Sequence, residues 1–130
     1  QLKYLNEDND YRRRLSEIYM SELKKLPNLN FINDSNYTYK SSKHLFQIYF
    51  ESTAGGKNRE GLIDHLHSNS IYPGVHYISN TNYSMYKNPD LPNTERFSES
   101  ILSLPLHLNL EVNDIKFVVE KIKEYILWRE

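Results

Sequence analysis

The sequence LFQIYF, residues 45–50, decides the fold class, because its side chains alternate in the way that a half-buried β-strand requires. Phe46, Ile48 and Phe50 fall on one face of such a strand, and the intervening side chains fall on the other. It is the clearest strand signal in the chain, and the helices and further strands can be placed outward from it.

Upstream of this strand, apolar residues recur every three or four positions from Asp8 to Leu26, which predicts a helix of about five turns. Pro27 ends that helix because proline cannot continue the hydrogen-bond pattern. Between helix and strand, a tyrosine-rich stretch predicts a short strand around Tyr37 to Tyr39.

Downstream, the Gly-Gly pair within Thr53–Lys57 predicts a turn, and Asn58 is a suitable N-cap for a helix that ends near Asn69. The residues from Ile71 to Tyr77 favour a strand that bends at Pro73. A polar loop then follows through residue 82.

Pro92 suits the first turn of a helix, with Phe97 and Ile101 predicted on its inner face. Leu102 to Leu104 follows as a strand candidate, and an apolar stripe from Ile115 to Ile126 predicts a final helix. This alternation of elements predicts an α/β fold, with a small mixed or antiparallel sheet of three to four strands covered by helices.

Composition narrows the function classes. The chain has 130 residues, 38% hydrophobic, which suits a single domain with one core. A net charge of -1 argues against nucleic acid or an anionic membrane as partner. There is no cysteine, and no apolar run is long enough for a membrane span or a signal peptide. We therefore expect a soluble protein of a reducing compartment, the cytoplasm.

The usual catalytic and metal-binding patterns are not evident. His65 and His67 lie two positions apart on a helix, so they point away from each other and predict solvated side chains rather than a metal site. Gly55 and Gly56 fit a tight turn better than a phosphate loop. The run Arg12 to Arg14 spreads around a helical turn, which predicts solvated surface with one arginine against a neighbouring domain.

The strongest candidate for a binding site is the loop from Gly74 to Tyr86, because binding residues concentrate in loops that follow strands. A surface loop with a buried histidine and tyrosine remains an equally good interpretation of these residues alone. The polar and aromatic candidates in it are His76, Tyr77, Asn80, Thr81, Asn82 and Tyr83.

Four blocks, taken together, resemble the C-terminal part of the DegT/StrS-type aminotransferases: Asn58–Leu66, Gly74-Val75-His76-Tyr77, Thr94-Glu95-Arg96 and Ile101–His107. Their order and spacing also match the family, and the resemblance covers nearly all of the chain. In the last block we favour a structural role, with leucines in the core, Pro105 ending a strand and His107 as an interior or rim histidine.

The resemblance implies the C-terminal small domain of an enzyme with the aspartate aminotransferase fold. Such enzymes use pyridoxal phosphate (PLP) to transfer an amino group, usually from glutamate, to a keto sugar carried on a nucleotide. Their products feed surface polysaccharide, lipopolysaccharide or antibiotic pathways. Residues 1–27 would be the long helix that joins the two domains, and residues 28–130 the sheet and helices of the small domain.

The family's catalytic lysine and most phosphate ligands belong to a large domain, so this chain alone is expected to be inactive and to bind no PLP tightly. The start at Gln1, without methionine, favours a piece of a longer protein. Apolar faces that normally meet the missing domain would then favour self-association.

By resemblance, His76, Tyr77 and the loop Ser79 to Tyr83 form one wall of the active-site cleft, near the interface of a homodimer. Many relatives carry a histidine where this chain has Thr81, which cannot titrate near neutral pH. Asn82 and Tyr83 would then share in recognising the sugar. Two alternatives stay open: a free-standing, non-catalytic binding module of the same fold, and, ranked last, a nucleic-acid-binding domain.

Overall fold

The computed structural model describes residues 2–32, 38, 40–86 and 90–128. Three strands form an antiparallel sheet in the order β1 (Leu29–Phe31), β2 (Phe46–Phe50) and β3 (Ile101–Leu104). Ile48 of β2 pairs with Phe31 on one side and Leu102 on the other. The predicted α/β class with a small antiparallel sheet is therefore confirmed.

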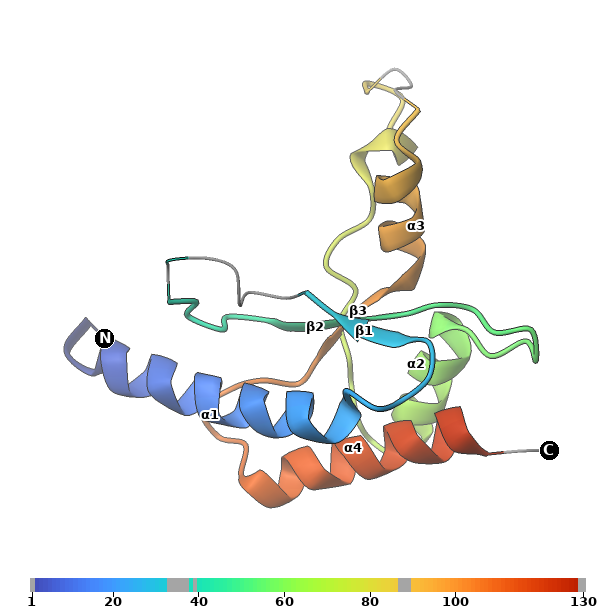
Figure 1. The fold of residues 1–130 in the computed structure, drawn as a ribbon. Helices are drawn as coiled ribbons and strands as arrows, with labels where there is room; N and C mark the ends of the chain where they lie inside the picture. The colour runs from blue at the N-terminus through green and yellow to red at the C-terminus, as the bar shows by residue number, and fades with distance from the viewer. Residues whose placement is uncertain (1, 33–37, 39, 87–89, 129–130) are drawn as a thin grey trace.

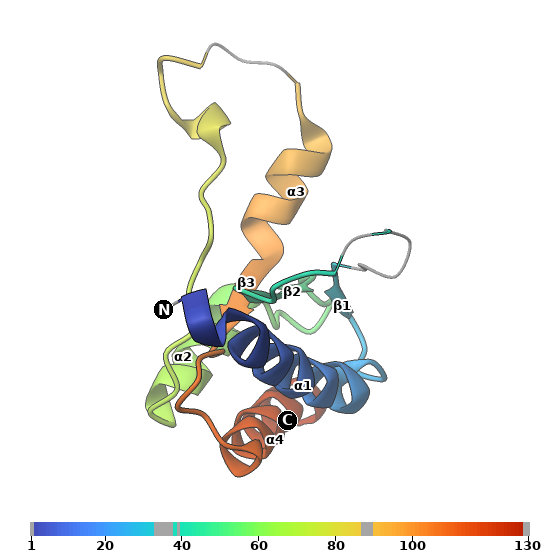
Figure 2. The same ribbon diagram turned by 90° about the vertical axis from the view of Figure 1, so that its left-hand side faces the viewer.

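Three helices cover one face of this sheet: α1 (Leu5–Leu23), α2 (Arg59–Ser68) and α4 (Val112–Leu127) (Figure 1). A short 3-10 helix, η1 (Leu2–Tyr4), precedes α1. The remaining α-helix, α3 (Pro92–Ser100), rises from the other side of the sheet and points away from the rest of the molecule (Figures 1 and 2). The sheet thus separates a covered face from an open one.

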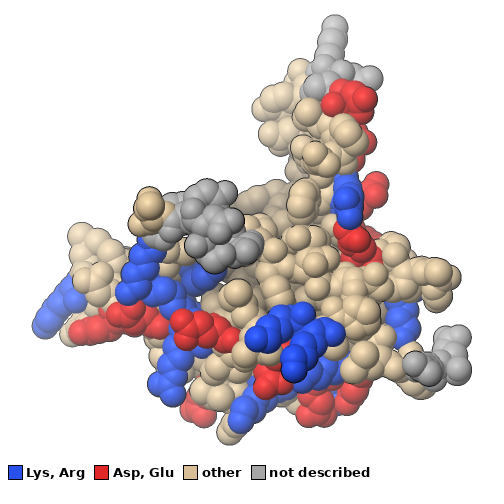
Figure 3. Space-filling model, viewed as in Figure 1, with Lys and Arg blue, Asp and Glu red and all other residues tan. Residues whose placement is uncertain are grey.

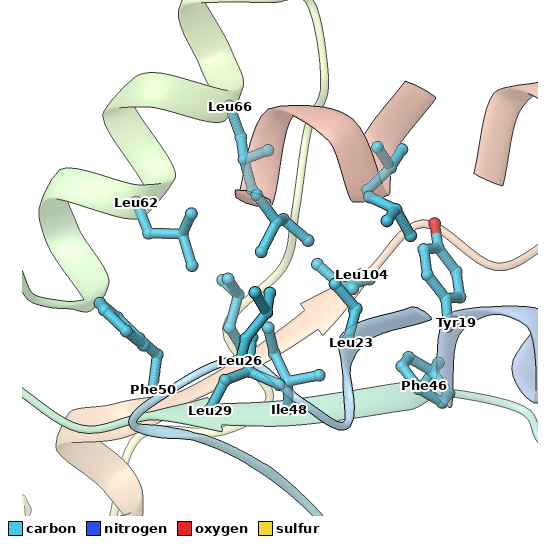
Figure 4. Close-up of a cluster of buried hydrophobic side chains, with 14 of the residues drawn as sticks. Tyr19, Leu23, Leu26, Leu29, Phe46, Ile48, Phe50, Leu62, Leu66 and Leu104 are labelled. Carbon is cyan, nitrogen blue, oxygen red and sulfur yellow. The ribbon is translucent and has the colours of Figure 1, made fainter. Parts of the chain in front are cut away.

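The core fills the space between the sheet and its three covering helices (Figure 4). The alternation predicted for β2 is confirmed, because Phe46, Ile48 and Phe50 are buried while Gln47 and Tyr49 are half-buried. Tyr19 of α1 stacks on Phe46 with 4.9 Å between ring centroids. Burial of this apolar surface supplies the main stabilisation of the fold.

Local signals set several helix ends. Asn58 caps α2 as predicted, since its side chain accepts a hydrogen bond of 2.9 Å from the Gly61 amide. Pro92 begins α3, also as predicted. At the start of α4, Glu111 and Asp114 form a capping box that sequence analysis had not identified.

The bounds of the first helix differ from the prediction. It runs over Leu5–Leu23 rather than residues 8–26. Pro27 favours this earlier end, because it has no amide hydrogen and its ring would crowd the Leu23 carbonyl in a continuing helix. Asn28 then adopts a positive φ of 56°. The strand predicted around Tyr37 to Tyr39 falls largely outside the described residues.

Two other predictions were wrong. Residues 71–77 form no strand; Gly74 alone makes an isolated bridge to Ser103 of β3, because Pro73 interrupts the pairing. Phe97 does not face the core but is 44% exposed, and Ile101 begins β3 instead of continuing the helix. Strand β1 was missed because three residues are too short to show a period.

Within the described residues, no helix combines the length and the apolar character that crossing a membrane would require.

Candidate functional site

The predicted binding loop lies on an arm that stands away from the sheet. We define the arm as residues 75–86 together with residues 90–100, which include α3. The loop segment and α3 run side by side as the arm rises from the open face of the sheet (Figures 1 and 2). At its base, the arm packs on this side of the sheet through the contact between Phe97 of α3 and Tyr49 of β2.

His76 lies where the arm leaves the sheet. Its Nδ1 atom is 2.9 Å from the Ser103 hydroxyl, and its backbone carbonyl accepts a hydrogen bond of 2.8 Å from the Gln47 side chain. His44 joins His76 and Ser103 in lining a hollow of about 200 Å³ beside β3. The structure therefore fixes His76 by contacts to two strands.

Tyr77 lines a different hollow, of about 310 Å³, between the loop and α3. Its side chain is 76% exposed, while Phe97 and Ser98 form the opposite wall from α3. The Ser79 amide donates a hydrogen bond of 3.1 Å to the Ser98 hydroxyl, which ties the two segments together. Tyr77 thus has the exposure that a ligand-contacting ring needs.

The remaining candidates lie further out on the arm. Asn80, Thr81 and Asn82 form the 3-10 helix η2 (Asn80–Asn82), and the Ser79 side chain accepts a hydrogen bond from the Thr81 amide at its start. The Thr81 hydroxyl is 2.7 Å from the Ser79 hydroxyl. Tyr83 is half exposed. The six candidates are therefore brought onto one arm, but His76 and Tyr77 line separate hollows.

The residues that hold the arm in place were not predicted from the sequence. Gln47 was placed only on the outward face of its strand, and Ser103 only within an apolar block. The alternation of β2 indicated that Gln47 points away from the core, but nothing local identified His76 as its partner. Phe97, which packs edge-on against Tyr49 with 5.1 Å between centroids, was assigned to the wrong face.

The two hollows do not form a complete site for PLP. A lysine must hold this cofactor covalently and move the proton in transamination. None of the described side chains that line either hollow is a lysine. Lys57, elsewhere on the surface, donates hydrogen bonds to the carbonyls of Ile126 and Trp128 at the end of α4.

The histidines on α2 differ from the prediction in one respect. His67 is exposed, as expected, and lies near the Tyr72 ring. His65 is half-buried rather than fully solvated, because α4 packs against it: its ring is 5.6 Å from that of Tyr125, and its Nε2 is 3.9 Å from Glu124. Among the described residues, no cluster of three or more metal-ligating side chains occurs.

The arginine run is largely engaged in local contacts. Arg13 donates to the Ser41 carbonyl at 2.9 Å and pairs with Asp10, while Arg12 donates to Asn9. Arg14 is exposed. On the face shown in Figure 3, basic and acidic side chains are interspersed over the body, and the charged side chains on the arm are mainly acidic. This face therefore offers no continuous basic surface of the kind that binds nucleic acid.

Comparison with solved structures identifies the same fold in part of larger proteins, one of them described as an aminotransferase. DesV from S. venezuelae, solved in complex with a ketimine intermediate, is 26% identical and superposes with a TM-score of 0.88 over 99% of this chain. TlmJ from Streptoalloteichus hindustanus gives the same TM-score at 24% identity over 98% of the chain. In both cases this chain spans 34% of the other protein.

Comparison of sequences identifies the family. The UDP-4-amino-4,6-dideoxy-N-acetyl-beta-L-altrosamine transaminase of Campylobacter jejuni is 30% identical over 95% of this chain, which spans 35% of that protein. The sequence model of the DegT/DnrJ/EryC1/StrS aminotransferase family matches residues 1–123. The chain therefore belongs to the DegT/DnrJ/EryC1/StrS aminotransferase family.

Proposed function

We propose that this chain is the C-terminal small domain of a PLP-dependent aminotransferase acting on a nucleotide-linked keto sugar. The observation that carries the proposal is the family match over residues 1–123, in a chain that spans about a third of its relatives. In this proposal residues 1–27 form the helix that joins a large domain, and residues 28–130 form the small domain.

The substrate class follows from the transaminase relative. Its name describes a UDP-linked sugar with an amino group at carbon 4, and transamination makes such a product from a ketone at the same carbon. We therefore propose a UDP-linked 4-keto-6-deoxy sugar as the first substrate to test. Glutamate is the proposed amino donor, and surface polysaccharide or lipopolysaccharide biosynthesis is the proposed pathway.

The arm is the proposed wall of the active-site cleft. His76, Tyr77 and the η2 residues Asn80, Thr81 and Asn82, followed by Tyr83, present hydroxyl, amide and aromatic groups away from the body. Such groups suit a sugar nucleotide, because hydroxyls and amides hydrogen-bond sugar oxygens while aromatic rings pack on the base or sugar face. In this role the arm binds and orients the sugar.

The chemical step belongs to the large domain in this proposal. PLP supplies the group that carries the amino nitrogen between donor and acceptor, and its lysine anchor is not found among the side chains of the two hollows. The chain by itself is therefore expected to be inactive. The whole enzyme is proposed to be a cytoplasmic homodimer.

The exposed apolar side chains of the arm support a proposed contact with the large domain or with a second subunit. Tyr77, Ile78, Met85 and Tyr86 are each at least half exposed. Exposed apolar patches of this kind mark interaction surfaces in soluble proteins.

The test uses the full-length protein that contains this chain, supplied with PLP, glutamate and a UDP-linked 4-keto-6-deoxy sugar. The expected result is formation of 2-oxoglutarate and an aminated sugar, together with the absorbance of a lysine-bound PLP imine. The 130-residue chain alone is the control and should show neither. A full-length protein that binds the sugar nucleotide but forms no imine would instead favour a non-catalytic binding module.

A further inference from the structure

The arm is attached to the sheet by polar contacts at a defined point. The Gly74 amide donates to the Ser103 carbonyl at 2.9 Å, and the Ser103 amide donates to the Gly74 carbonyl at 2.7 Å. This pair of hydrogen bonds holds Gly74 against the free side of β3. The chain leaves the sheet immediately afterwards.

The next contact is made by side chains. The Ser103 hydroxyl is 2.9 Å from Nδ1 of His76, and Ser103 itself is only 4% exposed. The His76 ring packs so closely over Gly74 that a Cβ atom at that position would lie 2.3 Å from its Cε1 atom. Glycine is therefore needed at residue 74 for the ring to reach Ser103.

A third contact comes from the central strand. The Gln47 side chain donates a hydrogen bond of 2.8 Å to the backbone carbonyl of His76. Gln47 and Ser103 are directly paired across β2 and β3, so their side chains leave the sheet on the same face. Together they hold both the ring and the backbone of His76.

We propose that Gln47 and Ser103 are positioning residues, which fix His76 and thereby the direction in which the arm presents Tyr77 and residues 80–83 to the sugar nucleotide. This inference rests on the proposed function. The two side chains act through His76, because β2 and β3, which carry them, lie at the base of the arm, while the loop that follows His76 extends away from the sheet (Figure 2).

The expected effect is selective for one substrate. Loss of either contact lets the arm move, which weakens binding of the sugar nucleotide but leaves the glutamate half-reaction to the large domain. We expect the KM for the sugar to rise about three- to tenfold, the effect of one lost hydrogen bond. The KM for glutamate should stay unchanged.

The experiment compares Ser103→Ala and Gln47→Met in the full-length protein. Ser16→Ala is the matched control, because Ser16 is 1% exposed and its hydroxyl donates to the Arg12 carbonyl within α1 at 2.8 Å, away from the arm. Ser103→Thr keeps the hydroxyl, so its KM for the sugar nucleotide should be close to that of the wild type. Thermal unfolding of each variant identifies any that fail to fold.

Amide hydrogen exchange supplies a second readout that does not need activity. Exchange of residues 77–86 should be faster in Ser103→Ala and Gln47→Met than in the wild type or in Ser16→Ala. Unchanged exchange in both variants, or an equal change in Ser16→Ala, would overturn the inference. An inactive wild-type protein would count against the proposed function alone, because the exchange experiment would still test the positioning role.

Discussion

The body and the arm of this molecule are stabilised in different ways. In the body, side chains from α1, α2, α4 and the sheet are buried together in one continuous core (Figure 4). On the arm, large apolar side chains such as Tyr77, Ile78 and Met85 stay exposed, and the base is held by hydrogen bonds. The body is therefore stable through its own packing, whereas the arm depends on its attachment and on whatever surface covers it.

The largest expected effect on stability comes from replacing one leucine by alanine in the body, compared with the same replacement on the arm. Leu102 of β3 is fully buried, and Leu91 at the start of α3 is 40% exposed. Leu102→Ala should lower the free energy of unfolding by about 2–5 kcal/mol, because it opens a cavity in the core. Leu91→Ala should change it by about 0.5 kcal/mol or less. Urea denaturation measures both, and similar losses would contradict the distinction between body and arm.

A second prediction concerns close packing within the body. A Cβ at Gly61 would lie 2.3 Å from the Tyr125 hydroxyl, and Tyr125 is held by ring contacts with Phe50 and His65. Gly61→Ala should therefore destabilise by about 1–3 kcal/mol, although alanine normally favours a helix.

The control for this variant is Gly55→Ala, where the nearest atom to the new Cβ is 3.8 Å away. Urea denaturation should show no loss of stability in this control. A stable Gly61→Ala protein would mean that α2 and α4 can separate at little cost.

A third prediction concerns how the free energy of unfolding depends on pH. Burial, with a smaller contribution from the Asp114 carboxylate, raises the pKa of Tyr19 well above its usual value of 10. Above pH 10 the unfolded chain releases this proton but the folded chain retains it, so stability should fall by about 1.4 kcal/mol per pH unit. The contribution is fully present below pH 10.

Tyr19→Phe should remove this loss of stability above pH 10. At neutral pH it should cost about 1 kcal/mol, because the hydroxyl donates a hydrogen bond of 3.0 Å to the Pro105 carbonyl. Unfolding free energies measured from pH 7 to 11 for both proteins would show curves that converge as pH rises. Parallel curves would contradict the assigned burial of Tyr19.

The smallest effect on overall stability is expected on the arm. Phe97→Ala removes the edge-on contact with Tyr49, which contributes about 0.5–1.5 kcal/mol. Since Phe97 is 44% exposed, the loss should appear mainly as faster amide exchange within residues 77–86 and 90–100 of the arm, with little change in exchange of α1 and α4. Exchange that rises equally in all three segments would show that the arm and body unfold together.

Elements with a local signal were predicted well from the sequence. The alternation of residues 45–50, the Asn58 cap and the stripe of α4 each depend on neighbours within a few positions. Strand β1 was missed and residues 71–77 were misassigned, because both depend on pairing with residues far along the chain. The same difference holds for the candidate site. His76 was named as a candidate from its local sequence, but its partners Gln47 and Ser103, which lie far along the chain, were not.

The sequence by itself determined the fold class and the family, and it singled out the candidate loop, because periodicity, capping and the order of motifs can all be read along the chain. Only the tertiary structure decided that the loop and α3 form a projecting arm, and that Ser103 and Gln47 hold it through His76. These contacts join residues 27 and 29 positions apart in the chain. They exist because the sheet places two outward-facing polar side chains beside the point where the chain departs.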